Sequence, residues 1–450
     1  MITMHTSEMA QLLTGELFGE DVEFSGASTD SRQLTGGELF IALRGERFDG
    51  HDFLQAAGEA GARAMLVEAT GDAELPGVVV PDTRRAMGTL ASAWRQRFRC
   101  PVIAVTGSNG KTTVKELLSA ILATAGEVLA TRGNLNNDIG VPLTLFGLDE
   151  ADDYAVIEMG ANHPGEIDYL TRLAQPDVAL ITQCAPAHLE GFGSVDGVAR
   201  AKAEIYGGLG HGGCAIINAD DAYVGFWSDM NVGRRVITFG LSGIADVRAE
   251  TIEQDTDGNQ SFQLLTPLGQ ADVRLPLLGR HNVMNALAAA AAVTALDFEP
   301  AIIARGLASP AMVAGRLTRL MGRAGSRLID DSYNANPGSL KVALETLVAQ
   351  PGRPWLVLGD MGELGDTAAA LHTAAGEQAR ALGVERLYAV GELSRYAVEA
   401  FAAGAVHCDS MEALIERLQD DIGDGVVVLI KGSRGAGMDR VTTALRGEET

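Results

Sequence analysis

The chain alternates short apolar runs of strand length with longer segments whose apolar residues repeat at helical spacing. The runs fall into three groups. The first group contains the runs 39–43, 64–67 and 77–80. The second contains 102–105, 154–160, 177–182 and 213–218. The third contains 326–333, 354–362, 386–391 and 425–435. Strands separated by helix-length segments form parallel sheets from βαβ units. Between about 233 and 278 the residues alternate apolar and polar, which predicts antiparallel strands there.

This grouping predicts three domains, at 1–84, 85–312 and 313–450. A chain of 450 residues is long enough for about three domains that each bury a core. The expected fold class is α/β. A central, mostly parallel sheet of the phosphate-loop type lies between a small α/β domain and a Rossmann-like C-terminal domain. Ligands of parallel sheets bind beyond the carboxyl ends of the strands, so polar loops that follow strands are candidates for the site.

Composition narrows the class of protein. Hydrophobic residues make up 46% of the chain and charged residues 21%, which is typical of a globular protein. The formal charge of −24 argues against a general binder of nucleic acid or of anionic membranes, which needs a basic face. The four cysteines are far apart, and no apolar run reaches membrane-spanning length. We therefore expect a cytoplasmic protein without membrane insertion, and a monomer.

The segment "VIAVTGSNGKTTVKELLSAIL" (102–122) predicts a phosphate-binding loop. A buried strand leads through a Gly-rich turn into a helix, where unpaired N–H groups and the helix dipole attract anions. Lys111 adds a positive charge for the outer phosphates and Thr112 a hydroxyl for Mg²⁺. The full phosphate-loop pattern has glycine where this chain has Val105, so the loop is a shortened variant; an ordinary turn with a surface lysine is the alternative. The predicted phosphate ligands are Gly107, Ser108, Asn109, Gly110, Lys111, Thr112 and Thr113.

Three further residues of the central domain are candidates for cation chemistry. Glu158 ends the run 154–157, where a carboxylate can hold Mg²⁺ or serve as a helix cap. His188 lies in a polar loop after the run 177–182, and a single histidine there is commonly structural. Lys202 lies on a helix beside Arg200 and Glu204, whose spacing predicts an ion pair that excludes Lys202.

Polar loops also suggest substrate-binding positions. "RGNLNNDIGVP" (132–142) places Asn136 and Asn137 in a loop whose amides suit sugar hydroxyls and carbonyl groups, although a turn-rich connector would look alike. In the third domain, "DDSYNANPGS" and "KGSRG" both follow strands and therefore lie at one edge of a sheet. These two loops contribute Asp331, Asn334, Asn336, Lys431, Ser433 and Arg434.

The motifs together resemble those of the Mur ligase family of peptidoglycan synthesis, over almost the whole chain. The matching segments are "STDSR" (28–32), "TGSNGKTT" (106–113), "GNLNNDIGVP", "IEMGANHPGEI", "AHLEGFGS", "AKAEIY", "GRHNVMNALAAA", "DSYNANPGS" and "KGSRG" (431–435). "DSYNANP" best separates the family members that add D-alanyl-D-alanine from those that add other amino acids. Gln183 departs from the asparagine usual in the family.

The resemblance implies an ATP-dependent ligase. Such an enzyme joins D-alanyl-D-alanine to UDP-N-acetylmuramoyl-tripeptide through an acyl phosphate, and so makes the pentapeptide precursor of peptidoglycan. It also implies two Mg²⁺ ions, one held by Thr112 and Glu158 and one by His188 and a carbamylated Lys202. Lys111, Lys202, His188 and Arg316 would be catalytic. Asn282 and Asn285 would meet adenine, Arg316 the phosphates and Asp331 the ribose. The implied substrate-binding residues are Ser31, Arg32, Asn136, Asn137, Asp331, Asn334, Asn336, Lys431, Ser433 and Arg434.

Two other functions stay open on the sequence. A sibling ligase, or a relative of folylpolyglutamate synthase, would share the phosphate loop and add another amino acid. An ATP-binding regulatory or scaffold protein would use the loop as a switch, but it would leave the third-domain polar loops unexplained. The third residue of the tripeptide, diaminopimelate or lysine, is also open.

Overall fold

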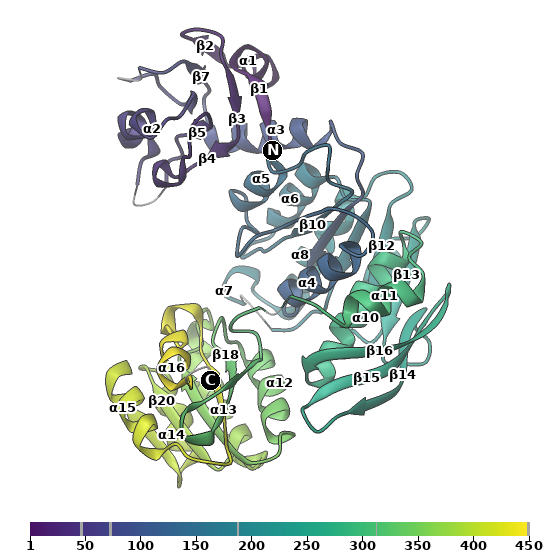
Figure 1. Cartoon of the computed structure of the whole chain (residues 1–450), viewed down its shortest axis with the longest axis vertical. Coiled ribbons are helices and arrows are strands. Elements are labelled where there is room, and N and C mark those ends of the chain that lie inside the picture. Colours follow the sequence, from purple (N-terminus) through teal and green to yellow (C-terminus); the bar gives the residue numbers. More distant parts are fainter. Residues whose placement is uncertain (46–47, 72–73, 187–188, 312, 448–450) are drawn as a thin grey trace.

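The structure is a computed structural model, and it describes residues 1–45, 48–71, 74–186, 189–311 and 313–447. Its elements form three groups along the long axis of the molecule (Figure 1). The N-terminal group lies at one end and the C-terminal group at the other, with the large sheet between them. No helix among the described residues is long and apolar enough to cross a membrane.

The N-terminal group is a small sheet with helices. Its five strands, in sheet order, are β2 (Glu16–Phe18), β7 (Gly77–Val79), β6 (Ala64–Val67), β5 (Leu39–Ile41) and β4 (Ala27–Ser28). Strands β1 (Thr3–His5) and β3 (Glu23–Ser25) pair separately, and the helices are α1 (Thr6–Leu13) and α2 (Leu54–Glu59). Phe40 and Met65 pack against Leu54 of α2 on one face of the sheet, while Leu39 and Leu66 are buried on the other face.

The central group is built on a nine-stranded sheet. In sheet order the strands are β16 (Gly269–Leu278), β15 (Asn259–Thr266), β14 (Val247–Gln254), β13 (Arg235–Gly240), β12 (Cys214–Asn218), β11 (Val178–Ile181), β8 (Val102–Thr106), β10 (Tyr154–Glu158) and β9 (Val128–Ala130). The helices are α3 (Thr83–Arg95), α4 (Lys111–Leu122), α5 (Gly140–Leu145), α6 (Glu166–Ala174), α7 (Leu189–Phe192), α8 (Val195–Ala203), α9 (Val224–Met230), α10 (Arg280–Thr294) and α11 (Pro300–Leu307).

Both faces of this sheet are covered, as its apolar strands require. Helices α4 and α10 pack on one face, where Ile103 and Val105 of β8 contact their apolar sides. Helices α3, α5, α6 and α8 cover the other face, where Ala104 is buried. The alanine-rich run 285–296 lies almost entirely within α10, and small side chains let this helix approach α4 closely. The predicted α/β class with a mostly parallel central sheet is confirmed.

The prediction of antiparallel strands from about residue 233 is only partly right. β13 pairs with β12 in parallel, and β14 pairs with β13 in parallel. Antiparallel pairing begins at β14 with β15 and continues to β16. The reason for the first difference is that α9 connects β12 to β13, and a helical crossover returns the chain in the same direction. The alternating pattern indicates that one face of each strand is buried. It does not indicate the direction in which the strand runs.

The C-terminal group is a six-stranded sheet between helices. In sheet order the strands are β17 (Thr318–Met321), β18 (Arg327–Asp331), β22 (Val426–Lys431), β19 (Arg353–Gly359), β20 (Arg386–Val390) and β21 (Ala405–Cys408). The helices are α12 (Pro337–Val348), α13 (Ala368–Ala381), α14 (Ser394–Phe401), α15 (Met411–Asp421) and α16 (Asp439–Leu445). Only β17 runs antiparallel to its neighbour, so the carboxyl ends of β18, β22 and β19 meet at one edge.

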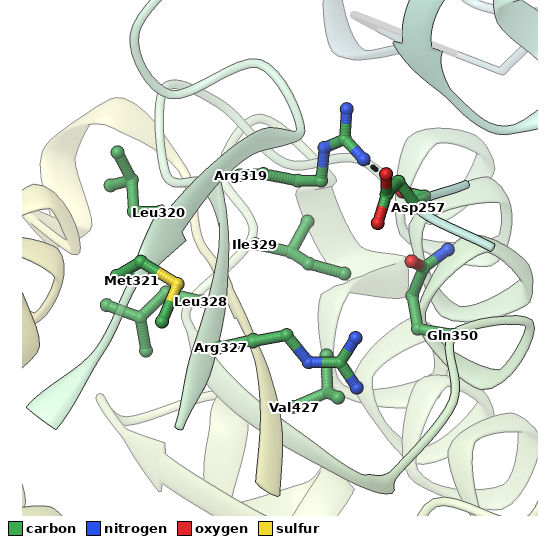
Figure 2. A pocket seen from close by; sticks show the side chains of 9 residues that line it. All are labelled: Asp257, Arg319, Leu320, Met321, Arg327, Leu328, Ile329, Gln350 and Val427. Atoms are coloured by element: carbon green, nitrogen blue, oxygen red, sulfur yellow. Dashed lines mark hydrogen bonds between the residues drawn. The ribbon is translucent and has the colours of Figure 1, made fainter. Parts of the chain in front are cut away.

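The central and C-terminal groups also touch away from that edge. Arg319 on β17 donates to the carbonyl of Asp257 in the β14–β15 turn (Figure 2). It also donates to the side chain of Asn259 at the start of β15. Beside it, Arg327 on β18 donates to the carbonyl of Pro351 within its own group. Asp257, Arg319 and Arg327 line a cavity of about 190 Å³ between the two groups. Arg319 therefore ties the orientation of the C-terminal sheet to the central domain.

Candidate active site

The phosphate loop has the backbone its sequence predicts. β8 ends at Thr106, and α4 begins at Lys111. Gly107 has φ 147°, and a Cβ there would lie 1.9 Å from the Thr182 hydroxyl oxygen. Gly110 has φ 83°, and a Cβ there would lie 2.5 Å from Asn285 Oδ1. No side chain caps the start of α4, so its first N–H groups face the loop and can bind an anion.

Lys111 lies folded over this loop. Its Nζ donates to the carbonyl of Gly107 at 2.8 Å, and desolvation of its amine lowers its pKa, an effect that Glu158 opposes. A bound phosphate could take the place of the carbonyl as the partner of the amine and would favour its charged form. The lysine is therefore held at the position where transferable phosphate would lie.

A cavity of about 240 Å³ opens between the phosphate loop, the start of α10 and the third domain. Seventeen of its lining residues carry polar side chains or belong to the loop: Ser108, Asn109, Gly110, Lys111, Thr112, Thr113, Thr182, Gln183, His281, Asn282, Asn285, Arg316, Asp331, Asn334, Asn336, Ser339 and Lys431. Two contacts close it from the third domain. Asn336 Nδ2 donates to Asn109 Oδ1 at 2.8 Å, and Arg316 Nη2 donates to the Thr112 hydroxyl at 3.5 Å.

The start of α10 forms one wall of this cavity. Asn282 Nδ2 donates to the Leu278 carbonyl at 2.8 Å, and Asn285 Nδ2 donates to Asn282 Oδ1 at 2.8 Å. Burial, with a smaller effect of Lys431, lowers the pKa of His281 to about 4, so this ring is neutral at physiological pH. The wall thus offers neutral polar groups, as recognition of an uncharged base requires. That Asn282 and Asn285 meet adenine stays a prediction.

Glu158 lies at the end of β10, the strand beside β8. Its Oε1 accepts from Asn136 Nδ2 at 2.9 Å, and its backbone N–H donates to the Thr131 hydroxyl at 2.9 Å. Its Oε2 is buried and has no hydrogen-bond partner among the described residues. A buried carboxylate oxygen without a partner is costly unless a cation binds it. The described residues contain no group of three or more His, Cys, Asp or Glu side chains that could hold a metal ion. A cation here would therefore take its other ligands from a hydroxyl such as that of Thr112, from phosphate or from water.

Lys202 on α8 is buried, with 2% of its surface exposed. Its Nζ lies 5.3 Å from the centre of the Phe192 ring. Desolvation, and then repulsion from Lys111, lowers its pKa to about 7. The amine is therefore neutral in a large fraction of molecules near neutral pH. His188, predicted to act with it, lies outside the described residues.

The predicted ion pair between Arg200 and Glu204 is wrong. The Glu204 carboxylate instead accepts from the backbone N–H groups of Gly165 and Asp168, at 2.8 and 3.1 Å. The Arg200 guanidinium lies over the Phe226 ring, 5.8 Å from its centre. Helix α6 begins at this point, and its unpaired N–H groups attract the carboxylate more strongly than an exposed i,i+4 arginine does. The spacing of Arg200 and Glu204 in the sequence could not reveal that the N–H groups at the start of α6 compete for the Glu204 carboxylate.

Asp331 and Lys431 are paired inside the third domain. They are register partners at the ends of β18 and β22, and Lys431 Nζ donates to Asp331 Oδ2 and, at 3.0 Å, to the Asn334 carbonyl. Burial raises the pKa of Asp331 and lowers the pKa of Lys431, and their mutual attraction opposes both shifts. Both residues line the cavity beside the phosphate loop, so the pair also holds the "DSYNANP" loop in place there.

A second cavity, of about 560 Å³, adjoins the first. Its lining residues with polar or aromatic side chains are Lys111, Asn134, Asn136, Asn137, Glu158, Asn162, Arg316, Tyr333, Asn334, Asn336, Glu363, Ser433 and Arg434. Two guanidinium groups lie over the Tyr333 ring. The guanidinium carbon of Arg316 lies 4.2 Å from the ring centre, and that of Arg434 lies 5.6 Å from it. Cations on an aromatic face are stabilised by the ring quadrupole. The cavity therefore combines a carboxylate that has one oxygen without a partner among the described residues with a cluster of positive charge, as a site for two approaching anions needs.

The predicted residues are brought together to different degrees. Lys111, Arg316, Asn334 and Asn336 line both cavities, and most of the others line one of them. Ser31 and Arg32 lie in the N-terminal group, and no described residue of that group lines either cavity. There Arg32 pairs with Asp30 at 2.7 Å, and the hydrogen bonds from Arg32 lower the pKa of Asp30 to about 2.

Eight lining residues with polar or aromatic side chains were not among the predicted site residues: Asn134, Asn162, Thr182, Gln183, His281, Tyr333, Ser339 and Glu363. Thr182 and Glu363 follow β11 and β19, so the carboxyl-end rule could have found them. His281 and Tyr333 lie inside motifs that were recognised. Their roles depend on which way each side chain points, which the motif does not state.

A phosphate loop that faces a second polar domain across a cation-rich cleft defines a nucleotide-dependent enzyme whose site forms between domains. The chain belongs to the Mur ligase family. Three family profiles match it: "Mur ligase family, catalytic domain" over 23–95, "Mur ligase middle domain" over 105–293, and "Mur ligase, glutamate ligase domain" over 315–434. The resemblance seen in the motifs is thereby confirmed.

Named relatives and solved structures extend this result. The UDP-N-acetylmuramoyl-tripeptide--D-alanyl-D-alanine ligase of Escherichia coli strain K12 is 46% identical, with all of both chains covered. The enzyme of that name from Bacillus subtilis strain 168 is 35% identical, with 99% of each chain covered. A crystal structure of MurF from Acinetobacter baumannii superposes with a TM-score of 0.92 at 38% identity, covering 98% of each chain. MurF of Thermotoga maritima in complex with ADP gives a TM-score of 0.82 at 27% identity, covering 93% of this chain and 96% of that one.

Proposed function

We propose that the chain is an ATP-dependent ligase that joins D-alanyl-D-alanine to UDP-N-acetylmuramoyl-tripeptide. The observation that carries this proposal is the pair of adjoining cavities in which Lys111 of the phosphate loop meets Asn334 and Asn336 of "DSYNANP". One cavity suits a nucleotide and the other suits the two groups to be joined. The full-length likeness to relatives of that name supports the choice of substrates.

In this proposal the nucleotide occupies the cavity beside the phosphate loop. Its phosphates lie against the start of α4, and its base lies against Asn282 and Asn285. Asp331 holds the ribose through Oδ1, which accepts from the Leu317 N–H at 3.2 Å and has a further lone pair for a ribose hydroxyl, while Arg316 reaches the phosphates from the third domain. The nucleotide then touches both domains, so its binding favours their closure. That the structure with ADP from Thermotoga maritima shares this fold supports the placement.

The reaction follows from the charges that line the second cavity. The terminal carboxylate of the tripeptide attacks the γ-phosphorus of ATP, the bond to the β–γ bridging oxygen breaks, and ADP leaves. The amine of the dipeptide then attacks the acyl carbon, and phosphate leaves with the electron pair of the broken C–O bond. Two anions must meet in the first step, and Lys111, Arg316 and Arg434 supply positive charge around that point. Closure of the cleft keeps water from hydrolysing the acyl phosphate.

The residues present fit a Mg²⁺ ion at Glu158. Its buried oxygen Oε2 has no hydrogen-bond partner among the described residues, and the Thr112 hydroxyl follows the phosphate-loop lysine. Mg²⁺ bound there would neutralise charge on the phosphates. The matching assignment of His188 and Lys202 to a second Mg²⁺ rests on the family resemblance.

A carbamylated Lys202 would supply an anionic oxygen where the unmodified chain has a buried amine. The neutral amine attacks CO₂, a C–N bond forms, and one proton is released. Such a reaction needs an unprotonated lysine, and the pKa of about 7 produced by burial provides one. Burial also shields the product from acid.

We assign the tripeptide-linked nucleotide to residues 1–84 and the central domain, with Ser31 and Arg32 at its uridine end and Asn136 and Asn137 nearer the chemistry. Residues 85–312 bind ATP, and residues 313–450 close on ATP and hold the dipeptide through Asn334, Asn336, Ser433 and Arg434. This division places the two ends of the long substrate in two domains. Remote binding energy can then be used to align the reacting carboxylate.

Mass spectrometry of the products tests the proposal. The full chain is incubated with ATP, Mg²⁺, D-alanyl-D-alanine and UDP-muramoyl-tripeptides that end in diaminopimelate or lysine. We expect a product heavier than the tripeptide by the dipeptide less water, together with one phosphate released for each bond. Single amino acids in place of the dipeptide serve as the control. Ligation of a single amino acid instead would assign the chain to a sibling activity, and no ligation with any acceptor would overturn the proposal.

A further inference from the structure

We propose that Lys115 and Thr131 position Glu158 to bind its metal ion, an inference that rests on the Mg²⁺ site of the proposed function. Lys115 lies on α4, one turn beyond the phosphate-loop lysine Lys111. Thr131 directly follows β9, the edge strand that pairs with β10. Lys115 is 4% exposed, Thr131 1% and Glu158 2%. Neither Lys115 nor Thr131 lines either of the two site cavities, so each would act through Glu158 and not by touching a substrate.

The hydrogen bonds between β9 and β10 change partners at Thr131. The two strands run parallel with Val156 opposite Ala130, and the Thr131 N–H donates to the Val156 carbonyl at 3.0 Å. In a regular parallel ladder the next bond would run from the Glu158 N–H to the Thr131 carbonyl. Instead, the Glu158 N–H donates to the Thr131 hydroxyl at 2.9 Å. The side chain of Thr131 thus takes the place of its own carbonyl as the partner of Glu158.

Lys115 is the partner of the carbonyl that the ladder leaves. Its Nζ donates to the Thr131 carbonyl at 2.8 Å and also to the Glu116 carboxylate. A buried ammonium group costs free energy even when it is paired, whereas the Glu158 N–H would satisfy this carbonyl without a buried charge. The lysine therefore does more than satisfy a backbone oxygen. It holds the backbone after Thr131 away from the ladder.

The chain that leaves the sheet at Thr131 returns to cover Glu158. Asn136 Nδ2 donates to Glu158 Oε1 at 2.9 Å, and the Gly160 N–H donates to the Asn136 carbonyl at 2.7 Å. Glu158 is thus held by Thr131 at its backbone and by Asn136 at one carboxylate oxygen, and its Oε2 has no hydrogen-bond partner among the described residues. Lys115 thereby connects the helix of the phosphate loop to the carboxylate proposed to bind the metal ion.

Calorimetric titration of the full chain with ADP, once in Mg²⁺ and once in EDTA, measures the metal contribution without catalysis. We define the metal factor as the Kd for ADP in EDTA divided by the Kd in Mg²⁺. Glu158→Gln sets the factor that remains when the proposed ligand is lost. For Lys115→Met and Thr131→Val we expect the factor to fall about tenfold, or to the Glu158→Gln value where that is higher, because loss of a group that holds a metal ligand commonly costs about 10–100-fold in metal affinity. The Kd in EDTA should stay near the parent value.

Conservative variants separate positioning from packing. Thr131→Ser keeps the hydroxyl and should keep the parent metal factor, whereas Thr131→Val keeps the shape of the side chain and should lose it. Thr294→Val is the matched control, because this hydroxyl is also buried and donates to the Ala290 carbonyl of its own helix. Lys115→Met combined with Thr131→Val should lower the factor no further than the larger single change, since both act at one backbone position. The Thr131 variants decide the question by themselves if Lys115→Met does not fold.

A parent-like metal factor in Thr131→Val and in folded Lys115→Met would overturn the inference and leave the proposed function intact. So would an equal rise of the Kd in Mg²⁺ and in EDTA, because that indicates a displaced phosphate loop. A Thr131→Ser variant that loses the factor as Thr131→Val does would also overturn it. A parent whose ADP binding does not respond to Mg²⁺ would instead overturn the proposed metal site.

Discussion

Asn336 Nδ2 donates a hydrogen bond to Asn109 Oδ1 at 2.8 Å, across 227 residues of sequence. The same side chain caps its own helix, since Asn336 Oδ1 accepts from the Ser339 N–H at 2.8 Å. One amide thus fixes the start of α12 and joins the third domain to the phosphate loop. This amide and the bond from Arg316 to the Thr112 hydroxyl both join the third domain to the phosphate-loop region.

Asn336→Asp tests this link. Aspartate caps a helix as well as asparagine does, but it has no N–H for Asn109 and adds negative charge beside the phosphates. We expect a thermal midpoint within a degree or two of the parent and a loss of about tenfold or more in kcat/KM for ATP. Asn336→Ala is the companion variant, because it also removes the cap and should cost about 1 kcal/mol of stability. Equal ATP kinetics in the parent and Asn336→Asp would show that the contact is incidental.

Lys111→Ala should abolish most of the activity. The side chain is the cation nearest the predicted γ-phosphate, and removal of one such stabilising group commonly costs about 10²–10³ in rate. The thermal midpoint should barely move, because the bond to the Gly107 carbonyl is made within the loop. Phosphate release measures the rate, and Lys341→Ala, an exposed lysine on α12, is the control. A Lys111→Ala variant with more than half the parent rate would contradict the phosphate-loop assignment.

Activity should depend on CO₂ and on pH through Lys202. With a pKa of about 7, the amine is neutral in about half of the molecules at pH 7 and in about a tenth at pH 6. Carbamylation requires the neutral form, so enzyme stripped of bicarbonate at pH 6 should lose activity and regain it when bicarbonate is added at pH 8. Lys202→Ala should be nearly inactive and partly rescued by short carboxylates, which replace the missing oxygen ligand. If carboxylates and bicarbonate have no effect, Lys202 is an unmodified buried amine.

Much of the fold followed from hydrophobic patterns. The runs 64–67, 154–160 and 177–182 correspond to β6, β10 and β11, and each lies where burial on both faces demands a continuous apolar run. The direction of β13 could not be predicted in this way. Direction depends on the connection, and α9 is a short helix of seven residues whose pattern is weak. The three domain bounds remain predictions.

Much of the site followed from one rule, that polar residues after parallel strands converge. The rule predicted that Lys111, Glu158 and Asn336 belong to the site, and all three line the larger cavity. It could not show that Asn336 reaches Asn109, or that Arg316 and Arg434 share the Tyr333 ring, since these contacts depend on how two domains meet. Local patterns carry no information on that interface.

Arg319 offers a way to test the interface far from the nucleotide. It donates to Asp257 (Figure 2) and to Asn259 across the domain boundary. Arg327 lines the same cavity but donates to Pro351 within its own domain. Arg319→Ala should raise the KM for ATP about three- to tenfold, because hydrogen bonds to a charged group that hold the domains together are lost. Arg327→Ala is the matched control and should leave this KM near the parent value. Similar ATP kinetics in the two variants would mean that the Arg319 contact does not govern closure.

The two ends of the molecule should respond to different substrates. Arg32 lies in the N-terminal group, where its guanidinium is 87% exposed and pairs only with Asp30 among the described residues, so it is available to a nucleotide. Arg32→Ala should raise the KM for UDP-muramoyl-tripeptide and leave the KM values for ATP and dipeptide near the parent. Some fall in kcat is expected, because remote binding energy helps to align the reacting carboxylate.

Arg434→Ala should instead raise the dipeptide KM or lower kcat, since its guanidinium lies over Tyr333 in the cavity where the chemistry is proposed. Calorimetric titration of each variant with UDP-muramoyl-tripeptide, beside steady-state kinetics, measures the division. If Arg32→Ala spares that binding while Arg434→Ala abolishes it, the assignment of domains to substrates is wrong.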